Sequence, residues 1–472
     1  MELDPLLLSR IQFAFVVSFH AIFPVFTIGL AAYIAVLEGL LFRTRDPAWE
    51  RLSKFWTKVF AVVFGMGVVS GIVMAFQFGT NWSNFSYATA NFLGPVLSYE
   101  VVTAFFLEAT FLGVLLFGRD KVPQGVHLFA AIMVAVGTFI SSFWILAANS
   151  WMQTPAGVEL QNGLFQMTSW SEAIFNSSFP YRFSHMVVAS FLTGSFVVAG
   201  VSAWYLLKGR ETALNRRALS MCLWLILFVA PLQMFIGDLH GLNTLKEQPT
   251  KLAAMEGHWE SKAGAPLILF AIPDSASETN HLEIGIPKLG SLILKHDVDG
   301  VVPGLKDVPA DERPPVGPTF WSFRVMVGIG VLMIAVGFWG AWLRFRGRLY
   351  DQPLFKRVLV AMIPAPFIAV LAGWFVTEIG RAPWLVYGQM THAEGLTPSL
   401  TGGMALFTLI GFIVVYSVVF AAGLYYLLRI VRTGIEEVEA QDEHPEQHRA
   451  KRPFSAADVP LEGGDGAPAT AR

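Results

Sequence analysis

Nine stretches of mainly apolar residues alternate with shorter polar segments along the chain. A helix that crosses a bilayer needs roughly 20 consecutive residues of this kind. Because each stretch reaches about that length, the pattern predicts an all-α, polytopic membrane protein with about nine transmembrane helices. The predicted spans are approximately residues 11–41, 54–78, 96–117, 126–148, 184–207, 218–240, 320–343, 357–379 and 404–429.

The short loops between these spans alternate between rich and poor in Lys and Arg. The rich loops carry Arg43, Arg45, Arg51, Lys54 and Lys58, then Arg119 and Lys121, then Lys208, Arg210, Arg216 and Arg217, then Arg344, Arg346, Arg348, Lys356 and Arg357. The poor loops carry no such residue in 79–95, then only Arg182, then only Arg381. Cytoplasmic loops hold the excess of basic residues. The pattern therefore predicts an N-terminus outside and a C-terminus in the cytoplasm.

The spans divide the chain into four parts. Residues 1–240 hold helices 1–6, and residues 320–430 hold helices 7–9. Residues 241–319 form a long loop, which lies outside because six spans return the chain to the side of the N-terminus. The tail, 431–472, is charged and ends in Gly, Pro and Ala, a composition that predicts a disordered cytoplasmic segment. The small residues of GMGVVSG at 65–71 predict close packing between helices.

The composition limits the environment, the partners and the metal sites that the chain can have. Only 14% of the 472 residues are charged against 54% hydrophobic, whereas a soluble domain has about 25% charged residues, so the chain requires a lipid bilayer. A net charge of −2 gives no basic field for nucleic acid. The single cysteine, Cys222, excludes disulfide frameworks, thiolate zinc sites and cysteine-held iron–sulfur clusters. Any metal must be held by His, Met or carboxylate. The N-terminus lacks the features of a cleaved signal peptide, so we expect the first apolar segment to be retained.

Five potential iron ligands lie in the outer half of the predicted membrane region, each on a different helix. They are His20, Glu100, His185, Met326 and Glu378. Ionisable groups inside a membrane are costly and indicate a function. His plus Met saturates a low-spin haem iron, whereas a His or a carboxylate opposite an open position leaves an iron that can bind oxygen. Arg10, Arg324 and Arg381 suit haem propionates because their charge persists at any pH.

Each residue also has a simpler interpretation. A lone His inside a membrane is more often a helix–helix hydrogen-bonding group, and a Met is more often packing. Glu100 and Glu108 could form the ion or proton site of a transporter. We expect His127 at the membrane surface, and His240 is a weaker ligand candidate. The residues alone therefore predict a redox or transport protein with a site near the outer face.

The motifs around these residues resemble the large subunit of cytochrome bd-type quinol oxidases over about residues 5 to 430. The matching stretches are SRIQFAFVVSFH (9–20), SYEVVTAFFLEATFLG (98–113), SSFWILAANSWMQTPAG (141–157), YRFSHMVVAS (181–190), QPTKLAAMEGHWE (248–260), WSFRVMVG (321–328) and GWFVTEIGRAPW (373–384). Several long motifs in the family's order make the resemblance specific. The loop of about 80 residues resembles the short quinol-loop form, to which some cyanide-insensitive oxidases belong.

The resemblance implies the ligand set and the cofactors. It places His185 and Met326 on a low-spin heme b, and His20 and Glu378 on two high-spin haems, namely a heme b and a heme d (or a heme b in its place). Trp374 lies one turn before Glu378 in the haem-binding signature. The resemblance also implies a second large membrane subunit as partner, since the family works with such a subunit and often with a small single-helix one.

The resemblance further implies the reaction, that of a quinol:oxygen oxidoreductase (EC 7.1.1 class) in the bacterial cytoplasmic (inner) membrane. Two quinols would be oxidised at the outer loop for each oxygen reduced to water, with Glu256 as proton acceptor and Lys251 as its partner. Glu100 and Glu108 share approximately one helix face and lie roughly 12 Å apart in depth, so we expect a relay for cytoplasmic protons, with Ser141 or Ser142 nearby. Such uptake would contribute to the proton motive force.

Two other functions remain as alternatives at this point. The first is a proton- or ion-coupled transporter, although we find no inverted repeat of the kind that such folds often contain. The second is a di-haem, quinone-linked electron-transfer subunit, which would favour bis-His ligation.

Overall fold

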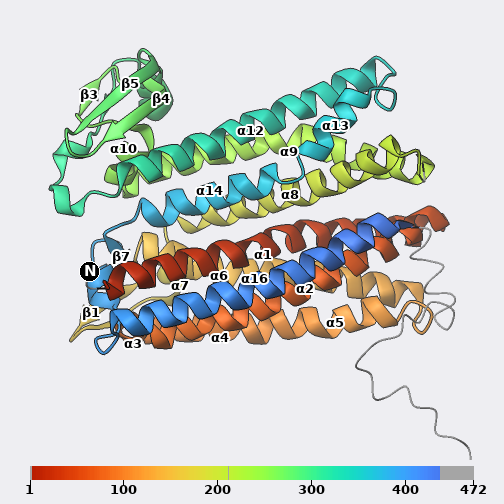
Figure 1. Cartoon of the computed structure of the whole chain (residues 1–472), viewed down its shortest axis with the longest axis horizontal. Coiled ribbons are helices and arrows are strands. Elements are labelled where there is room, and N and C mark those ends of the chain that lie inside the picture. The colour runs from red at the N-terminus through yellow and green to blue at the C-terminus, as the bar shows by residue number, and fades with distance from the viewer. Residues whose placement is uncertain (1–2, 211, 436–472) are drawn as a thin grey trace, which may run out of the picture.

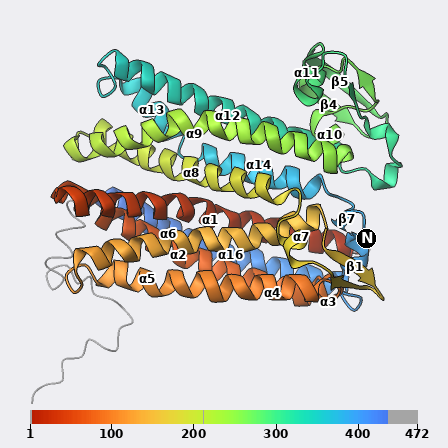
Figure 2. The same ribbon diagram turned by 180° about the vertical axis from the view of Figure 1, so that it is seen from behind.

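The structure, a computed structural model that describes residues 3–210 and 212–435, consists of long helices that run side by side (Figure 1). Seven of the long helices are single elements. They are α1 (Pro5–Thr44), α2 (Pro47–Thr80), α6 (Gln124–Gln153), α8 (Phe179–Leu207), α9 (Thr212–Glu247), α12 (Val316–Phe345) and α16 (Gly402–Thr433). In the second view the same helices lie in the same order from behind (Figure 2).

Two further long helices are composite. The first joins α4 (Ala90–Glu100) through a π-helical segment (Val101–Phe105) to α5 (Phe106–Phe117). The second breaks between α13 (Pro353–Ala361) and α14 (Ala365–Ile379). Pro364 lies at this break, where its missing N–H cannot serve a continuous helix. Within the described residues, nine helices are thus long and apolar enough to cross a membrane, which confirms the nine predicted spans.

Short elements gather at one end of the bundle, which we call the loop end (Figures 1 and 2). They are α3 (Ser83–Ala88), β1 (Val158–Gln161), β2 (Leu164–Met167), α7 (Trp170–Ile174), α10 (Pro249–Glu256), β3 (Lys262–Ala263), β4 (Leu267–Asp274), β5 (Thr279–Ile286), α11 (Leu289–Lys295), β6 (Val301–Val302), β7 (Trp384–Val386), β8 (Met390–Thr391) and α15 (His392–Gly395). The strands pair antiparallel as β1–β2, β3–β6, β4–β5 and β7–β8.

The long segment predicted as a loop at 241–319 is therefore largely folded. Its first residues continue α9 as far as Glu247, and two short 3₁₀ turns, Leu305–Asp307 and Ala310–Glu312, precede α12. The predicted disordered tail falls mainly at 436–472, which lies outside the described residues. Which membrane side the loop end faces stays a prediction of the charge pattern.

The main hydrophobic core lies in the half of the bundle away from the loop end. Phe55, Trp56 and Phe60 of α2 and Phe196 and Tyr205 of α8 are almost fully buried there. The α1 and α8 backbones touch, since a Cβ on Gly29 would lie 2.1 Å from the Ser190 carbonyl oxygen. A second, smaller core at the loop end contains Trp82, Phe92, Trp151 and Phe165.

A buried ionic cluster joins α1, α2 and α6 at the end opposite the loops. Glu38, which has no exposed surface, accepts hydrogen bonds from Ser53 and Arg119. His127 lies between Glu38 Oε2, 3.0 Å from its Nδ1, and the Leu115 carbonyl oxygen, 3.1 Å from its Nε2. His127 is thus buried among protein side chains, with 1% exposure, in the first turn of α6, and its predicted depth near the membrane surface stays a prediction.

Replacing Glu38 with leucine should destabilise the protein by about 3–5 kcal/mol, because it leaves Arg119 buried without its anion. Thermal unfolding followed by tryptophan fluorescence measures the change. The double variant Glu38→Leu/Arg119→Leu should recover part of the loss. Arg217→Leu, which breaks a half-exposed pair with Asp46, should change the melting temperature little and serves as control. An unchanged melting temperature in Glu38→Leu would contradict a stabilising cluster.

Candidate functional site

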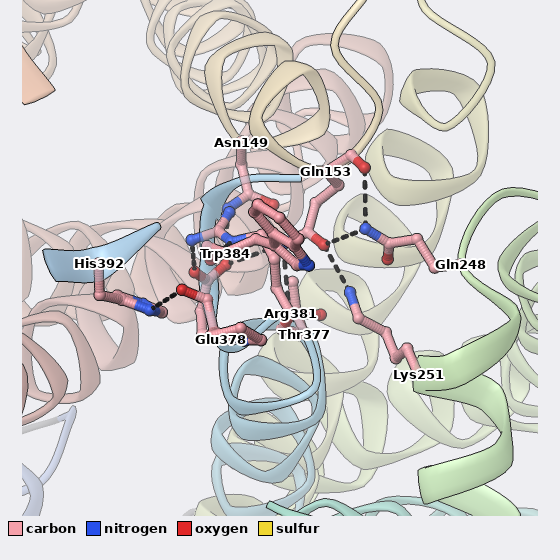
Figure 3. Close-up of polar contacts among 10 residues, drawn as sticks. Asn149, Gln153, Gln248, Lys251, Thr377, Glu378, Arg381, Trp384 and His392 are labelled. Atoms are coloured by element: carbon pink, nitrogen blue, oxygen red, sulfur yellow. Dashed lines mark hydrogen bonds and ion pairs between the residues drawn. The ribbon is translucent and has the colours of Figure 1, made fainter. Parts of the chain in front are cut away.

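A network of polar side chains joins α6, α10 and α14 at the loop end (Figure 3). At its centre is Glu378, on the last turn of α14. Its Oε1 accepts a hydrogen bond from Asn149 Nδ2 at 2.9 Å, and its Oε2 accepts one from Arg381 at 2.5 Å. The structure thereby brings together Glu378, a predicted iron ligand, and Arg381, a predicted partner for haem propionates.

Gln153 connects Glu378 to the Lys251 segment. The Lys251 ammonium nitrogen lies 2.5 Å from Gln153 Oε1, and the Gln153 amide nitrogen lies 3.3 Å from the Thr377 carbonyl and 3.4 Å from Glu378 Oε1. Gln248 donates to the Gln153 carbonyl at 2.8 Å. Sequence reasoning did not single out Gln153, although it lies in the WMQTPAG stretch that contributed to the resemblance.

Lys251 is 3% exposed, and its pKa lies well below the usual value. Burial is the main cause, and the charges of Arg182 and Arg381 add to it, while Glu378 opposes them. This environment therefore disfavours the charged form of Lys251 relative to an exposed lysine. Burial likewise lowers the pKa of His392 to about 4, with contributions from Arg381 and Arg10.

Arg324 anchors the loop segment to α12. Its three nitrogens contact the Glu256 carboxylate at 2.9 Å, the Ile268 carbonyl at 2.8 Å and the Met255 carbonyl at 3.3 Å. Its guanidinium also lies 4.5 Å from the centre of the Phe320 ring. Glu256 of α10, which is 6% exposed, is thus held by a residue of α12. That residue, Arg324, lies two positions before Met326. The haem-propionate contact predicted for Arg324 stays a prediction, and the structure gives this residue a second task in holding the loop.

The predicted ligand His20 has one ring nitrogen engaged and one available. Its Nδ1 lies 2.9 Å from Ser70 Oγ, and that hydroxyl donates to the Gly67 carbonyl at 3.0 Å. Because the hydroxyl proton is already used, Ser70 accepts from His20 Nδ1–H, which leaves the lone pair on Nε2. A hydrogen bond from the ring nitrogen that does not bind the metal is typical of metal-ligating histidines.

Glycines face three of the predicted ligands. A Cβ on Gly71 would lie 3.0 Å from the His20 ring, one on Gly237 would lie 3.3 Å from the His185 ring, and one on Gly373 would lie 3.0 Å from Met326 Sδ. These distances are tighter than normal packing allows, so any larger side chain would push the ligand away. Gly71 belongs to the small-residue stretch that predicted close helix packing. Within the described residues, no hydrogen bond joins His20, His185 and Met326 to one another.

The donor set fits haem better than a bare metal ion. The buried nitrogens that have no hydrogen-bond partner in the described chain include His185 Nδ1, Arg182 Nε and Arg381 NH1. Unpartnered buried nitrogens are costly, and a bound group could satisfy them, with its iron beside the histidine and its carboxylates beside the arginines. Among residues 3–210 and 212–435, no three His, Cys, Asp or Glu side chains converge as a bare metal site requires. A haem supplies its own four equatorial nitrogens and needs only axial ligands.

Three other predicted or candidate residues lie on the elements around this network. Arg10 lies on the second turn of α1, and Trp374 lies on α14 one turn before Glu378. The His240 ring lies 5.6 Å from that of His185, so both histidines face the same region. Sequence reasoning missed Arg182 as a site residue, although its position one turn before His185 could have indicated it.

The π-helical segment aligns Glu100 with Glu108. Residues eight apart on a plain α-helix differ by about 80° around the axis, whereas residues seven apart complete about two turns. A π-bulge inserts one extra residue between the two acids. Glu108 therefore lies on the same side of the helix as Glu100, as a residue seven positions away would on a plain α-helix. Both face α6, where Ser141 Oγ donates to Glu100 at 2.7 Å and a Cβ on Gly137 would lie 2.5 Å from Glu108 Cγ. The prediction that the two acids share a helix face is thus confirmed.

The fold is that of a polytopic membrane protein, and the buried His, Met and Glu side chains on several of its helices are those expected of the redox class. The sequence matches the family of the cytochrome bd terminal oxidase subunit I over residues 8–435. The chain belongs to this family.

Relatives and a solved structure agree with this assignment over nearly the whole chain. The cytochrome bd ubiquinol oxidase subunit 1 of Bacillus subtilis (strain 168) is 36% identical, over 96% of this chain and 98% of the relative. The cytochrome bd-II ubiquinol oxidase subunit 1 of Escherichia coli (strain K12) is 32% identical, over 94% and 99% respectively. A chain of the bd oxidase from Geobacillus thermodenitrificans superposes with a TM-score of 0.84 at 34% identity, covering 92% of this chain and 99% of that chain.

Family membership decides between the functions that the residues left open. The chain is a subunit of a terminal respiratory oxidase, which excludes the transporter and the electron-transfer subunit without oxygen chemistry. It is an oxidoreductase that carries haem and works with at least one further subunit. With nine apolar helices in the part of the chain that the structure describes, it is a multi-pass protein of the bacterial inner membrane.

Proposed function

We propose that the chain is the quinol-oxidising and oxygen-reducing subunit of a quinol:oxygen oxidoreductase of the EC 7.1.1 class. The observation that carries the proposal is the hydrogen-bonded line from Lys251 through Gln153 to Glu378, which connects the loop segment to a predicted iron ligand. Two relatives are named ubiquinol oxidases, whereas a third, 30% identical over 91% of this chain, is named a putative cytochrome bd menaquinol oxidase subunit I of Bacillus subtilis (strain 168). The substrate is therefore proposed as a quinol.

The proposed haem ligands follow from the donors and their surroundings. His185 and Met326 hold a low-spin heme b, and His20 and Glu378 hold two high-spin groups, a heme b and a heme d (or a heme b in its place). Bound haem supplies the iron that takes up electrons and reduces oxygen. The unpartnered nitrogens of Arg182 and Arg381 support their role as propionate partners. Arg10, Arg324 and Trp374 lie in the stretches that carry the resemblance and complete the proposed pocket.

Quinol binds in this proposal beside α10, within the segment 241–319. Glu256 accepts a proton from the quinol hydroxyl, and Arg324 holds its carboxylate in place. Lys251 orients the other end of the ring, because its buried amine has a hydrogen bond to Gln153 and a pKa well below the usual value. Carboxylate and amine thus flank the substrate from one short helix.

The loop end faces the outer side of the membrane in this proposal, with the C-terminus in the cytoplasm. Protons released from quinol then leave on the outer side, whereas those for water formation come from the cytoplasm. Glu108 and Glu100 carry these protons along α6, with Ser141 bonded to Glu100. The separation of release from uptake contributes to the proton motive force.

The partners in this proposal are a second large membrane subunit, a small single-helix subunit of the kind often present in the family, and the lipid bilayer. The helices expose large apolar side chains that these partners would cover, such as Phe76 at 65%, Phe407 at 79% and Tyr425 at 68%. The net charge of −2 supports the absence of a nucleic-acid partner.

Reduced-minus-oxidised absorption spectra of the purified complex, with and without carbon monoxide, test the proposal alongside oxygen consumption with quinol. We expect a low-spin b signal and a second haem signal that shifts with carbon monoxide. A red chlorin band establishes heme d, whereas haem b alone with the same shift establishes heme b in its place. A complex that holds haem but consumes no oxygen with any quinol would contradict the proposed reaction.

Gln153→Leu should lower the maximal turnover by roughly 10- to 100-fold, the range typical of residues that orient metal ligands. The change breaks the contact to Lys251 and leaves Glu378 with one donor fewer, whereas the low-spin spectrum from His185 should persist. Turnover and the high-spin absorption bands are measured together. Gln166→Leu, which removes a loop-end amide bonded to Asn91, is the matched control. Equal turnover in the two variants would contradict the coupling role of Gln153.

A further inference from the structure

The hairpin formed by β4 and β5 exposes large apolar side chains at the loop end. They are Leu269 at 49%, Phe270 at 38%, Ile272 at 47%, Leu282 at 72%, Ile284 at 62% and Ile286 at 44%, and we call them the apolar patch. An antiparallel sheet that packs one face on a core usually turns polar side chains outward on the other. The patch departs from this rule and marks an interaction surface.

The hairpin does not need the patch for its own packing. Ile268 and Ala271, 2% and 0% exposed, already pack on Phe320 of α12 and form the buried side. The six patch residues therefore contribute no comparable burial within the described chain.

Leu282 projects outward from a strained backbone position. The pairing of Phe270 with Ile284 and of Ile272 with His281 leaves an extra residue on β5, which is a β-bulge. Leu282 lies in this bulge with a φ of 52°, a left-handed conformation that favours glycine and is rare for bulky residues. A leucine held outward at this cost indicates a contact beyond the chain itself.

The patch continues the lipid-facing surface of α12. In both overall views the hairpin lies at the loop end of α12, on the outer side of that helix away from α8 (Figures 1 and 2). The Phe270 ring contacts the Trp321 ring at 5.2 Å, and Trp321 is itself 38% exposed. Along the same helix, Val325 and Leu332 are 40% and 47% exposed. Tryptophans with such neighbours are typical of the membrane–water boundary.

The depth of the patch follows from its polar neighbours. Within the described residues β5 pairs only with β4, so its outer edge carries unpaired backbone groups. Such an edge cannot lie in the hydrocarbon region. Exposed Glu283 and His281 also require water. The boundary between headgroups and acyl chains, where interfacial segments insert their apolar face, accommodates both kinds of group.

The hairpin is bonded directly to the segment that carries Glu256. Asn280 Nδ2 donates to the Gly257 carbonyl at 2.8 Å, and Trp259 Nε1 donates to Asn280 Oδ1 at 3.0 Å. We propose that the apolar patch lies in the headgroup boundary of the leaflet at the loop end and gives membrane-dissolved quinol a lipid-side entrance towards Glu256. The docking of the hairpin on the membrane is argued from the apolar patch alone, whereas the entrance for quinol rests on the proposed function.

Fluorescence quenching in the intact complex, placed in phosphatidylcholine nanodiscs, tests the docking without turnover. Leu282→Cys carries an environment-sensitive thiol label, and Cys222 stays unlabelled because it is 2% exposed. Asp311→Cys, exposed in the same loop segment, is the control. A spin label on the lipid near its headgroup should quench position 282 at least about twofold more than position 311. Iodide in the water should quench in the opposite order.

Two results would overturn the docking. Position 282 could respond to iodide as position 311 does, which would place the patch in water. Alternatively, it could respond to neither quencher, which would mean that a protein surface covers the patch. Neither readout depends on quinol oxidation, so failure of the docking is distinguishable from failure of the proposed function.

Kinetics test the entrance. Leu282→Ser/Ile284→Ser should raise KM about three- to tenfold for a quinol with a long isoprenoid tail, because the variant weakens binding outside the reacting centre. The KM for a short-tailed, water-soluble quinol should not change. Leu160→Ser, half exposed on the β1–β2 hairpin, should change neither constant. Equal KM shifts for both quinols, or none, would overturn the entrance, whereas no oxidation by the unaltered complex would instead refute the proposed function.

Discussion

Met326→Leu should abolish the low-spin haem spectrum and lower quinol oxidation by at least about 10- to 100-fold, the loss typical of damage to residues that support a metal site. Leucine fills a volume similar to that of methionine but offers no sulfur, so the variant tests ligation rather than packing. The spectrum at liquid-nitrogen temperature and the steady-state oxygen consumption measure the two effects. Gly373→Ala should produce the same spectral change in weaker form, because the added methyl group would lie 3.0 Å from the Met326 sulfur.

Met333→Leu is the matched control for this prediction. Met333 lies about two turns further along α12 and is 5% exposed in the main core. The same chemical change there should leave the spectrum and turnover intact. A low-spin spectrum that survives in Met326→Leu would remove Met326 from the ligand set and leave His240, whose ring lies 5.6 Å from that of His185, as the next candidate.

The helices and their order could be predicted from the sequence because a membrane imposes one strong rule. Every span must be long and apolar, so runs such as 404–429 are visible without any knowledge of tertiary contacts. The fold inside 241–319 could not be predicted in this way, since its strands and turns depend on packing against α12. The π-helical segment was likewise invisible, because its residues Val101–Phe105 have no composition that distinguishes them from an α-helix.

Several of the predicted iron ligands carry chemistry that is unusual for their place in the chain. His20 and Glu378 are conspicuous inside apolar stretches, whereas Gln153 and Ser70 are ordinary at a helix end or among small residues. Their importance follows only from what they touch, namely Lys251 and Glu378 for Gln153, and His20 for Ser70. Positioning residues of this kind require coordinates, because a sequence does not reveal hydrogen bonds between distant helices.

Glu108→Leu should slow oxygen reduction by roughly 10²-fold while the low-spin haem stays bound and reducible by quinol, since positioned proton-transfer groups contribute about 10²- to 10⁴-fold. The argument rests on the alignment of Glu108 with Glu100 and on the shared contact with α6, where Ser141 bonds Glu100. Flow-flash measurement of oxygen reduction in the pre-reduced enzyme isolates the step that consumes protons.

Two further variants separate a proton role from a structural one. Glu108→Gln keeps the volume and hydrogen-bonding capacity of the side chain but cannot release a proton, so it should be as slow as Glu108→Leu. Thr110→Leu, an exposed position half a turn further along α5, should react at the normal rate. A normal rate in Glu108→Gln would show that this residue is not a proton carrier, and the protons would then have to reach the site along a path outside α5 and α6.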